Sequence, residues 1–247
     1  MSTSHEHIVK SFDSELERLY GEISRMGEIA IAQLDAAIDV LVRRDSKAAH
    51  HVVGNDIAID GLEREVSQDV LRLLALRQPM ARDLREIVAA LKIAADIERI
   101  CDYAANVAKR SIALAQSPPV QLVHALPRMA HLALLLVKDV IDAYVARDAD
   151  KAMRVWNRDE ELDAMYASVF REFLTYMMED PRNIGACTHL LFMAKNIERI
   201  GDHATNIAEN LYYLVHGTPL TEARPKGDRS SLEMFSPGAG APPPPAE

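Results

Sequence analysis

Apolar side chains recur every three or four residues along most of this chain, the spacing that places them on one face of an α-helix. A first helix is predicted over about residues 8–44. Asp45 follows it, and an aspartate carboxylate can accept hydrogen bonds from the free N–H groups that start a helix. A second helix is therefore predicted to end at about residue 76, before Pro79, which lacks a backbone N–H. The next stretch predicts a third helix over about 81–115.

The same order of features recurs in the second half of the chain. A fourth helix is predicted over about 120–147, followed by Asp148 in the capping position. A fifth helix then runs to about residue 178, where Pro181 interrupts the pattern. A sixth is predicted over about 183–215 and ends before glycine and proline residues that stop helices.

Residue identities show that the two halves are copies of one unit. Residues 97–108 read IERICDYAANVA and residues 197–208 read IERIGDHATNIA, with eight of the twelve positions identical. Two unrelated amphipathic helices would share apolar spacing but not these polar identities. We therefore infer duplication of a unit of about 100 residues.

This organisation predicts an all-α fold of two tandem, sequence-related antiparallel three-helix bundles, with six long helices in total. Short connections make neighbouring helices antiparallel. We expect residues 1–116 to form the first repeat and residues 120–217 the second. Residues 218–247 are rich in proline and glycine, so they are expected to form a disordered tail.

Composition narrows the class of protein. The 247 residues are 49% hydrophobic and 26% charged, with a formal net charge of −9 and no basic block. Nucleic-acid binding relies on clustered Lys and Arg, so it is not expected. The first residues show no signal pattern, and the longest apolar run, 132–137, is far shorter than the roughly 20 residues that span a bilayer. We expect a cytoplasmic protein with no direct membrane insertion.

Acidic residues form a narrow stripe on the third helix of each repeat. At 100° per residue, the polar positions of either helix fall within about 80° of arc, away from the apolar face. We therefore expect them to point outward or along the edge of the core. These positions are Glu98, Asp102 and Asn106 in the first repeat, and Glu198, Asp202, Asn206 and Glu209 in the second.

The middle helix of each repeat adds a second acidic pair, spaced i and i+4. These pairs are Asp56 with Asp60, and Asp159 with Asp163. If the middle and third helices are neighbours, four carboxylates converge and repel one another, which a cation would relieve. Oxygen ligands suit Mg²⁺, Mn²⁺, Ca²⁺ or iron. The alternative is an ordinary solvated helix face, on which Arg99 and Arg199 would pair with local acids.

No enzyme is expected, because the sequence contains no Gly-rich phosphate loop, no nucleophile elbow and no zinc-protease motif. A carboxylate-bridged, ferritin-like protein is the alternative that we keep open. Such sites use a Glu-x-x-His motif on inward-facing helices, and this chain has none.

The segment 197–209, IERIGDHATNIAE, resembles the signature of the PhoU family of phosphate transport regulators. Asp83-Leu84-Arg85 with residues 90–93 and 97–100 is similar to the first-repeat counterpart. The resemblance covers about residues 8–217. It implies a negative regulator of the phosphate-starvation response and of phosphate uptake, acting between the cytoplasmic ATPase of a phosphate ABC transporter and a sensor histidine kinase.

The resemblance also implies sites for metal clusters on the bundle surface, holding Fe, Zn, Mg or Mn. Carried over to this chain, the ligands are the eight acids of the two repeats: Asp56, Asp60, Glu98, Asp102, Asp159, Asp163, Glu198 and Asp202. Asn106, Asn206 and Glu209 would be supporting polar residues. We expect a homodimer, in contact with the membrane only through its protein partners. The first repeat differs from the second in having Cys101 and Lys109 where the second has Gly201 and Glu209.

Overall fold

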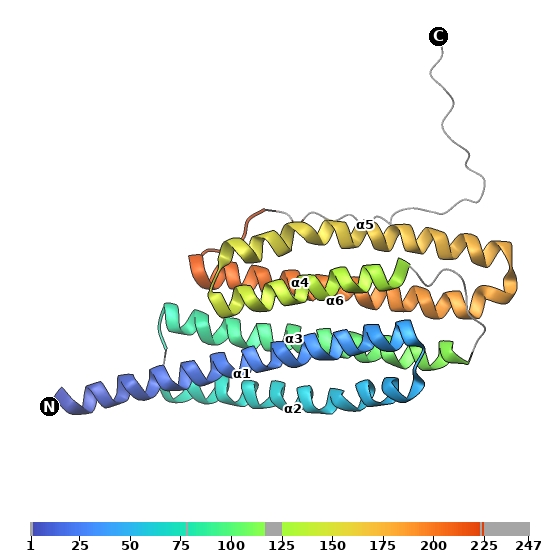
Figure 1. Cartoon of the computed structure of the whole chain (residues 1–247). Coiled ribbons are helices and arrows are strands. Elements are labelled where there is room, and N and C mark those ends of the chain that lie inside the picture. The colour runs from blue at the N-terminus through green and yellow to red at the C-terminus, as the bar shows by residue number, and fades with distance from the viewer. Residues whose placement is uncertain (1, 78, 117–124, 223, 225–247) are drawn as a thin grey trace, which may run out of the picture.

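The computed structural model describes residues 2–77, 79–116, 125–222 and 224, with side chains from residue 12 onward. Its elements run along one long direction (Figure 1). They are α1 (Ser2–Arg43), α2 (Ser46–Arg77), α3 (Arg82–Ala115), α4 (Ala125–Ala146), α5 (Ala149–Glu179), the short 3₁₀ helix η2 (Pro181–Asn183) and α6 (Ile184–His216). Over these ranges there is no strand, which confirms the expected all-α class. None of the described helices is long and apolar enough to cross a bilayer.

The aspartates expected to cap helices do so. Asp45 Oδ1 accepts hydrogen bonds from the N–H groups of Lys47 and Ala48, at 2.9 and 3.1 Å. Asp148 Oδ1 accepts one from Lys151 at 2.8 Å. Each carboxylate thus satisfies N–H groups that the helix itself leaves free.

One helix start differs from expectation, and the expected start of another lies outside the described residues. α1 begins at Ser2 rather than near residue 8, because no proline or glycine precedes that point to stop the helix. α4 begins at Ala125, and the residues expected to start it, from 120, lie outside the described part of the chain. Both proline breaks lie where predicted: α2 ends before Pro79, and Pro181 opens η2.

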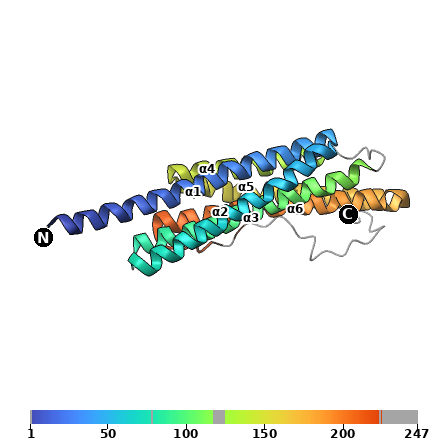
Figure 2. The ribbon, with the colours of Figure 1, turned by 90° about the horizontal axis from the view of Figure 1, so that it is seen from below.

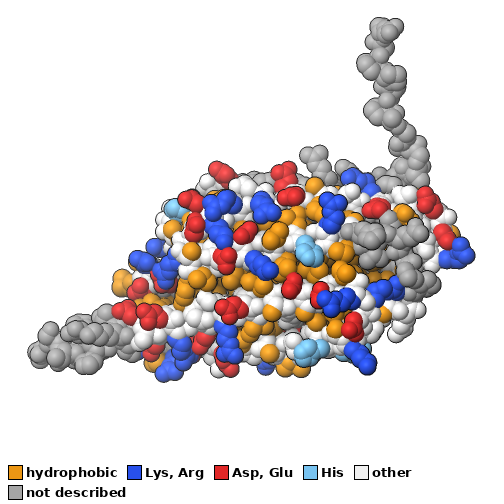
Figure 3. Space-filling model, viewed as in Figure 1, with side chains coloured by type: hydrophobic (Ala, Val, Ile, Leu, Met, Phe, Trp, Pro, Cys, Tyr) orange, Lys and Arg blue, Asp and Glu red, His pale blue; other side chains and the backbone are white. Residues whose placement is uncertain are grey.

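The two repeats lie side by side and antiparallel. α1–α3 form one bundle and α4–α6 the other, with α3 packed against α6 and α1 against α4 (Figures 1 and 2). On the face shown in Figure 3, acidic and basic side chains are interspersed, and hydrophobic side chains gather along the middle.

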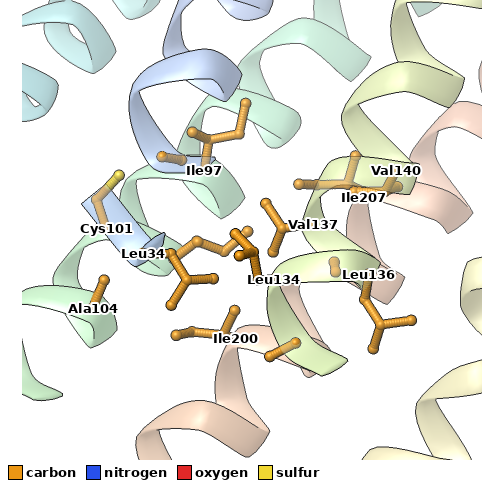
Figure 4. Close-up of a cluster of buried hydrophobic side chains, with 14 of the residues drawn as sticks. Leu34, Ile97, Cys101, Ala104, Leu134, Leu136, Val137, Val140, Ile200 and Ile207 are labelled. Carbon is orange, nitrogen blue, oxygen red and sulfur yellow. The ribbon is translucent and has the colours of Figure 1, made fainter. Parts of the chain in front are cut away.

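One continuous hydrophobic core joins the two bundles. Figure 4 shows its centre, where Leu34 of α1, Ile97 of α3, Val137 of α4 and Ile200 of α6 lie among one another. All four are at most 1% exposed. Burial of apolar area is the main stabilising contribution to folding, so the repeats stabilise each other.

Polar contacts fix the alignment of α3 with α6. Asp96 Oδ1 lies 2.8 Å from His203 Nδ1 and accepts a hydrogen bond from Asn206 Nδ2 at 3.2 Å. The rings of Tyr103 and His203, which occupy equivalent positions in the two repeats, have centroids 5.7 Å apart. Equivalent residues therefore face each other across the junction.

A second polar junction lies where α4 ends. The Tyr20 ring stacks on Tyr144, with centroids 4.8 Å apart, and its hydroxyl donates to the Tyr144 carbonyl at 2.7 Å. Arg147 Nη1 pairs with Glu86 Oε1 of α3 at 2.9 Å. These contacts link α1 and α3 to the turn between α4 and α5.

A glycine allows α5 and α6 to approach closely. A Cβ atom added at Gly201 would overlap Leu162 Cδ2 and lie 2.6 Å from Asp159 Oδ1. Leu162 is fully buried and cannot easily move away. The first repeat has Cys101 at the equivalent position, so the two bundles are not packed identically here.

We expect Gly201→Ala to destabilise the protein. Overpacking costs about 1–3 kcal/mol, which exceeds the gain of about 1 kcal/mol in helix propensity. The midpoint of thermal unfolding should fall by about 2–4 °C per kcal/mol of net loss. Calorimetry checks this.

Gly54→Ala on α2 is the matched control. No heavy atom lies within 4 Å of an added Cβ there, so we expect the helix-propensity gain alone and a raised midpoint. A Gly201→Ala protein as stable as Gly54→Ala would contradict the close approach of α5 and α6.

Candidate functional site

The eight acidic residues gather in two clusters, one in each repeat. The first acidic cluster comprises Asp56 and Asp60 of α2 with Glu98 and Asp102 of α3. The second acidic cluster comprises Asp159 and Asp163 of α5 with Glu198 and Asp202 of α6. α2 packs against α3 and α5 packs against α6, so the middle and third helices are neighbours, as expected.

The first acidic cluster is half-buried, and α3, which carries two of its acids, also supplies a cation. Arg99 pairs with Glu98 at 3.3 Å and with Asp102 at 2.8 Å. Burial raises the pKa values of Asp56 and Glu98, and the Asp102 charge adds to both. Local pairing by Arg99 agrees with the solvated-face alternative.

Two buried residues lie under this cluster. Gln33 of α1 is 5% exposed, and its Nε2 donates to the Cys101 carbonyl at 3.2 Å and to Asp56 Oδ1 at 3.4 Å. Burial, reinforced by the neighbouring carboxylates, raises the pKa of the Cys101 thiol, which therefore stays protonated. Cys101 is buried and forms no disulfide, so it is a packing residue.

The third-helix acids were expected to point outward or along the edge of the core, and in the second acidic cluster α5 covers Glu198 there, together with the aspartates of α5 itself. Asp159, Asp163 and Glu198 are 1%, 3% and 5% exposed. α5 lies directly over the polar stripe of α6, because Gly201 permits their close approach. Asp202 is the one member of this cluster that keeps an accessible side chain, at 30%.

Two cations compensate the buried charges, and the sequence pattern indicated neither. Lys195 Nζ lies 2.9 Å from Glu198 Oε1. Arg224, beyond the end of α6, pairs with Asp159 and lies 2.8 Å from Asp202 Oδ1. Arg224 falls in the segment expected to be disordered, so that expectation is wrong at this residue; residues 223 and 225–247 lie outside the described part of the chain.

The pKa values reflect how far these acids are removed from water. Burial raises the pKa of Glu198 to about 7, with Lys195 opposing the shift and Asp202 and Asp163 adding to it. Burial also raises the pKa of Asp159, against the opposing charge of Arg224. Desolvation thus dominates over ion pairing in this cluster.

The supporting polar residues have other contacts. Asn206 donates to Asp96 at the junction of the repeats. Glu209 Oε1 accepts a hydrogen bond from Trp156 Nε1 at 2.9 Å. Asn106 is half-buried on α3. Arg199, which would pair with a local acid under the solvated-face alternative, lies over the Tyr103 ring at 5.7 Å.

The chemistry of the acidic side chains favours metal binding, but their positions in the structure do not form a metal site. Asp159 Oδ1 and Glu198 Oε2 are buried oxygens without a hydrogen-bond partner, which a hard cation would satisfy. Yet in the part of the chain that the structure describes, no three His, Cys, Asp or Glu side chains converge on one ion. Metal binding would therefore require the carboxylates to turn and the paired cations to leave.

Comparison with known proteins identifies the family. The family model of the PhoU domain matches the chain twice, over residues 23–111 and 126–211. The chain belongs to the PhoU family. Each match lies within one of the two three-helix bundles, so the inferred duplication corresponds to two PhoU domains.

Relatives match along nearly the whole chain. The phosphate-specific transport system accessory protein PhoU homolog of Xylella fastidiosa is 59% identical over 94% of this chain and 98% of its own length. The homolog of Rhizobium meliloti is 50% identical over 92% of this chain and 97% of its own. The crystal structure of PhoU from Pseudomonas aeruginosa superimposes with a TM-score of 0.82 and 38% identity, covering 84% of this chain and all of that one.

PhoU proteins are regulatory accessory proteins and not enzymes. The expectation of a non-enzymatic protein is thereby confirmed for this PhoU chain. The clusters are accordingly to be understood as binding or structural sites.

We expect Glu198 to make this PhoU protein less stable as pH rises. Because its folded pKa, about 7, exceeds the ordinary value of 4.5, the folded state retains the proton longer than the unfolded state. The stability that protonated Glu198 contributes is fully present below about pH 4.5 and is lost as pH rises through about 7. In metal-free buffer, the free energy of unfolding of Glu198→Gln should rise relative to that of the unchanged protein by up to about 3 kcal/mol as pH increases over this range.

Denaturant unfolding at a series of pH values measures this difference. Glu160→Gln on the exposed side of α5 is the control for removing one carboxylate at a solvent-facing position. If the difference in unfolding free energy between Glu198→Gln and the unchanged protein did not change with pH, Glu198 would ionise normally in the folded protein.

Proposed function

We propose that this chain is a cytoplasmic negative regulator of the phosphate-starvation response and of phosphate uptake. It acts as an adaptor between the cytoplasmic ATPase of the phosphate ABC transporter and a sensor histidine kinase. The observation that carries the proposal is the match of both PhoU domains, with relatives named as accessory proteins of phosphate-specific transport covered along 98% and 97% of their length.

Within this proposal, the first acidic cluster offers partners the more accessible acidic surface. The side chains of Glu98 and Asp102 are 20% and 30% exposed, and Arg99 beside them is 55% exposed. Exposed charges of this kind contribute mainly to the rate and specificity of association. The buried acids of the second cluster are unsuited to direct contact.

The same clusters are the proposed sites for Fe, Zn, Mg or Mn ions. Support comes from the all-oxygen ligand sets, from the mutual repulsion of the carboxylates and from the unpartnered oxygens of Asp159 and Glu198. A bound ion would supply positive charge that organises this surface. We do not propose a ferritin-like oxidase, since the buried acids have no Glu-x-x-His partner motif.

Deletion of the gene tests the regulatory proposal. In phosphate-rich medium, a bacterial strain lacking the protein should secrete high alkaline phosphatase activity, because repression is lost. The intact gene should restore low activity. Low activity in the deletion strain would contradict a negative regulator.

Variants in the same assay test the role of the first acidic cluster. Asp60→Asn with Asp102→Asn should fail to restore repression while far-UV circular dichroism stays unchanged. The matched control is Asp39→Asn with Asp142→Asn, two exposed aspartates at equivalent repeat positions. Equal repression by both double variants would exclude the cluster from partner contact.

We also propose a homodimer. Hydrophobic side chains gather in a band on the face shown in Figure 3. Large apolar side chains that are exposed in the protein include Leu135 (49%) and Val145 (52%) of α4 and Val42 (55%) of α1. Contiguous exposed apolar surface of this kind marks association sites. Light scattering should give twice the chain mass of 27.4 kDa, falling to one chain mass for Leu135→Asp. A monomer in the unchanged protein would contradict the proposal.

A further inference from the structure

The chain beyond α6 turns back over the second acidic cluster. Gly217 ends the helix in the left-handed conformation, φ 75°, and its N–H donates to the Tyr213 carbonyl at 2.8 Å. Leu220 then packs partly buried against the core. In Figure 1 this segment, coloured red, leaves the end of α6 and crosses towards α5.

The segment is long enough to bring Arg224 back to the second acidic cluster. Asp202 lies fourteen residues before the helix end at His216, which is about 21 Å of helical rise. The eight residues from His216 to Arg224 span at most about 26–29 Å. The chain length is therefore sufficient for the Arg224 side chain to reach Asp202 when the segment runs back along the bundle.

The Arg224 guanidinium bridges the two helices that carry the cluster. Its side chain is 14% exposed, and Nη2 contacts Asp159 Oδ2 of α5 and Asp202 Oδ1 of α6. The contact is incompletely satisfied, because Arg224 Nε, Asp159 Oδ1 and Glu198 Oε2 are all buried without a hydrogen-bond partner. Unsatisfied buried groups make an ion pair less favourable than its charges suggest.

We propose that Arg224 is the built-in cation of the second acidic cluster, and that a divalent metal ion and the segment after α6 compete for the same carboxylates. The metal part of this inference rests on the proposed function; the role of Arg224 as counter-cation does not. With Arg224 in place, part of the cluster's negative charge is compensated without metal. Metal entry displaces Arg224 and releases the segment.

The first acidic cluster has no such coupling. Its cation, Arg99, belongs to α3 itself and is 55% exposed, so its side chain can move aside without moving the backbone. The two clusters therefore differ in what metal binding does: only at the second does occupancy change the position of a chain segment. Metal binding at the second acidic cluster would therefore change the structure at a distance from the metal, in the segment after α6.

Thermal unfolding of Arg224→Ala in buffer with EDTA tests the counter-cation. Loss of the guanidinium leaves buried carboxylates uncompensated, and the midpoint should fall by roughly 5–10 °C. Arg224→Lys keeps the charge and should lose less. Arg182→Ala, whose side chain is 90% exposed, is the matched control and should change little. An unchanged midpoint for Arg224→Ala overturns the counter-cation role.

Mn²⁺ titration calorimetry tests the competition. The background carries Asp56→Asn, Asp60→Asn, Glu98→Gln and Asp102→Asn, so that only the second cluster remains. Arg224→Ala in this background should bind Mn²⁺ on the order of tenfold more tightly, and Mn²⁺ should restore its midpoint. Equal affinity with and without Arg224 overturns the competition alone. No Mn²⁺ binding in either protein overturns the competition together with the proposed metal site.

Discussion

The antiparallel packing of α3 against α6 determines the arrangement of the other four helices. Both are the third helices of their repeats, and each is covered on its remaining sides by the other helices of its own bundle. Their shared apolar surface places Ile97 and Ile200 in one core, and Asp96 with His203 and Asn206 sets the alignment. Since the polar stripe of each helix lies away from this core centre, both acidic clusters end up on the sides covered by α2 and α5.

The depth of each cluster depends on one residue of its third helix. Gly201 lets α5 close over α6, so Asp159 is almost fully removed from water. At the equivalent position the Cys101 side chain fills space, and Asp56 stays half-buried. The same four acids thus have two environments: in one, water and a flexible arginine compensate charge; in the other, Lys195 and Arg224 do so.

Periodicity, capping residues and prolines in the sequence were sufficient to predict the six helices, because these features act locally. Internal identity was sufficient to predict the duplication. Burial of the second cluster could not be inferred, since the angle of Glu198 on its helix does not say which helix covers it. Gly201 was the available signal for a close helix approach. Arg224 could not be found, because nothing in a proline-rich segment identifies which of its cations will meet a buried acid.

The meeting of Tyr103 and His203 at the junction of the repeats has an evolutionary consequence. They occupy one position of the duplicated unit, so an unduplicated ancestor that paired in this way would have placed the same side chain on both sides. Every substitution would then have appeared twice, and a change useful to one site would have been imposed on the other. In the single chain the two positions are encoded separately, so Gly201 and Cys101 can differ.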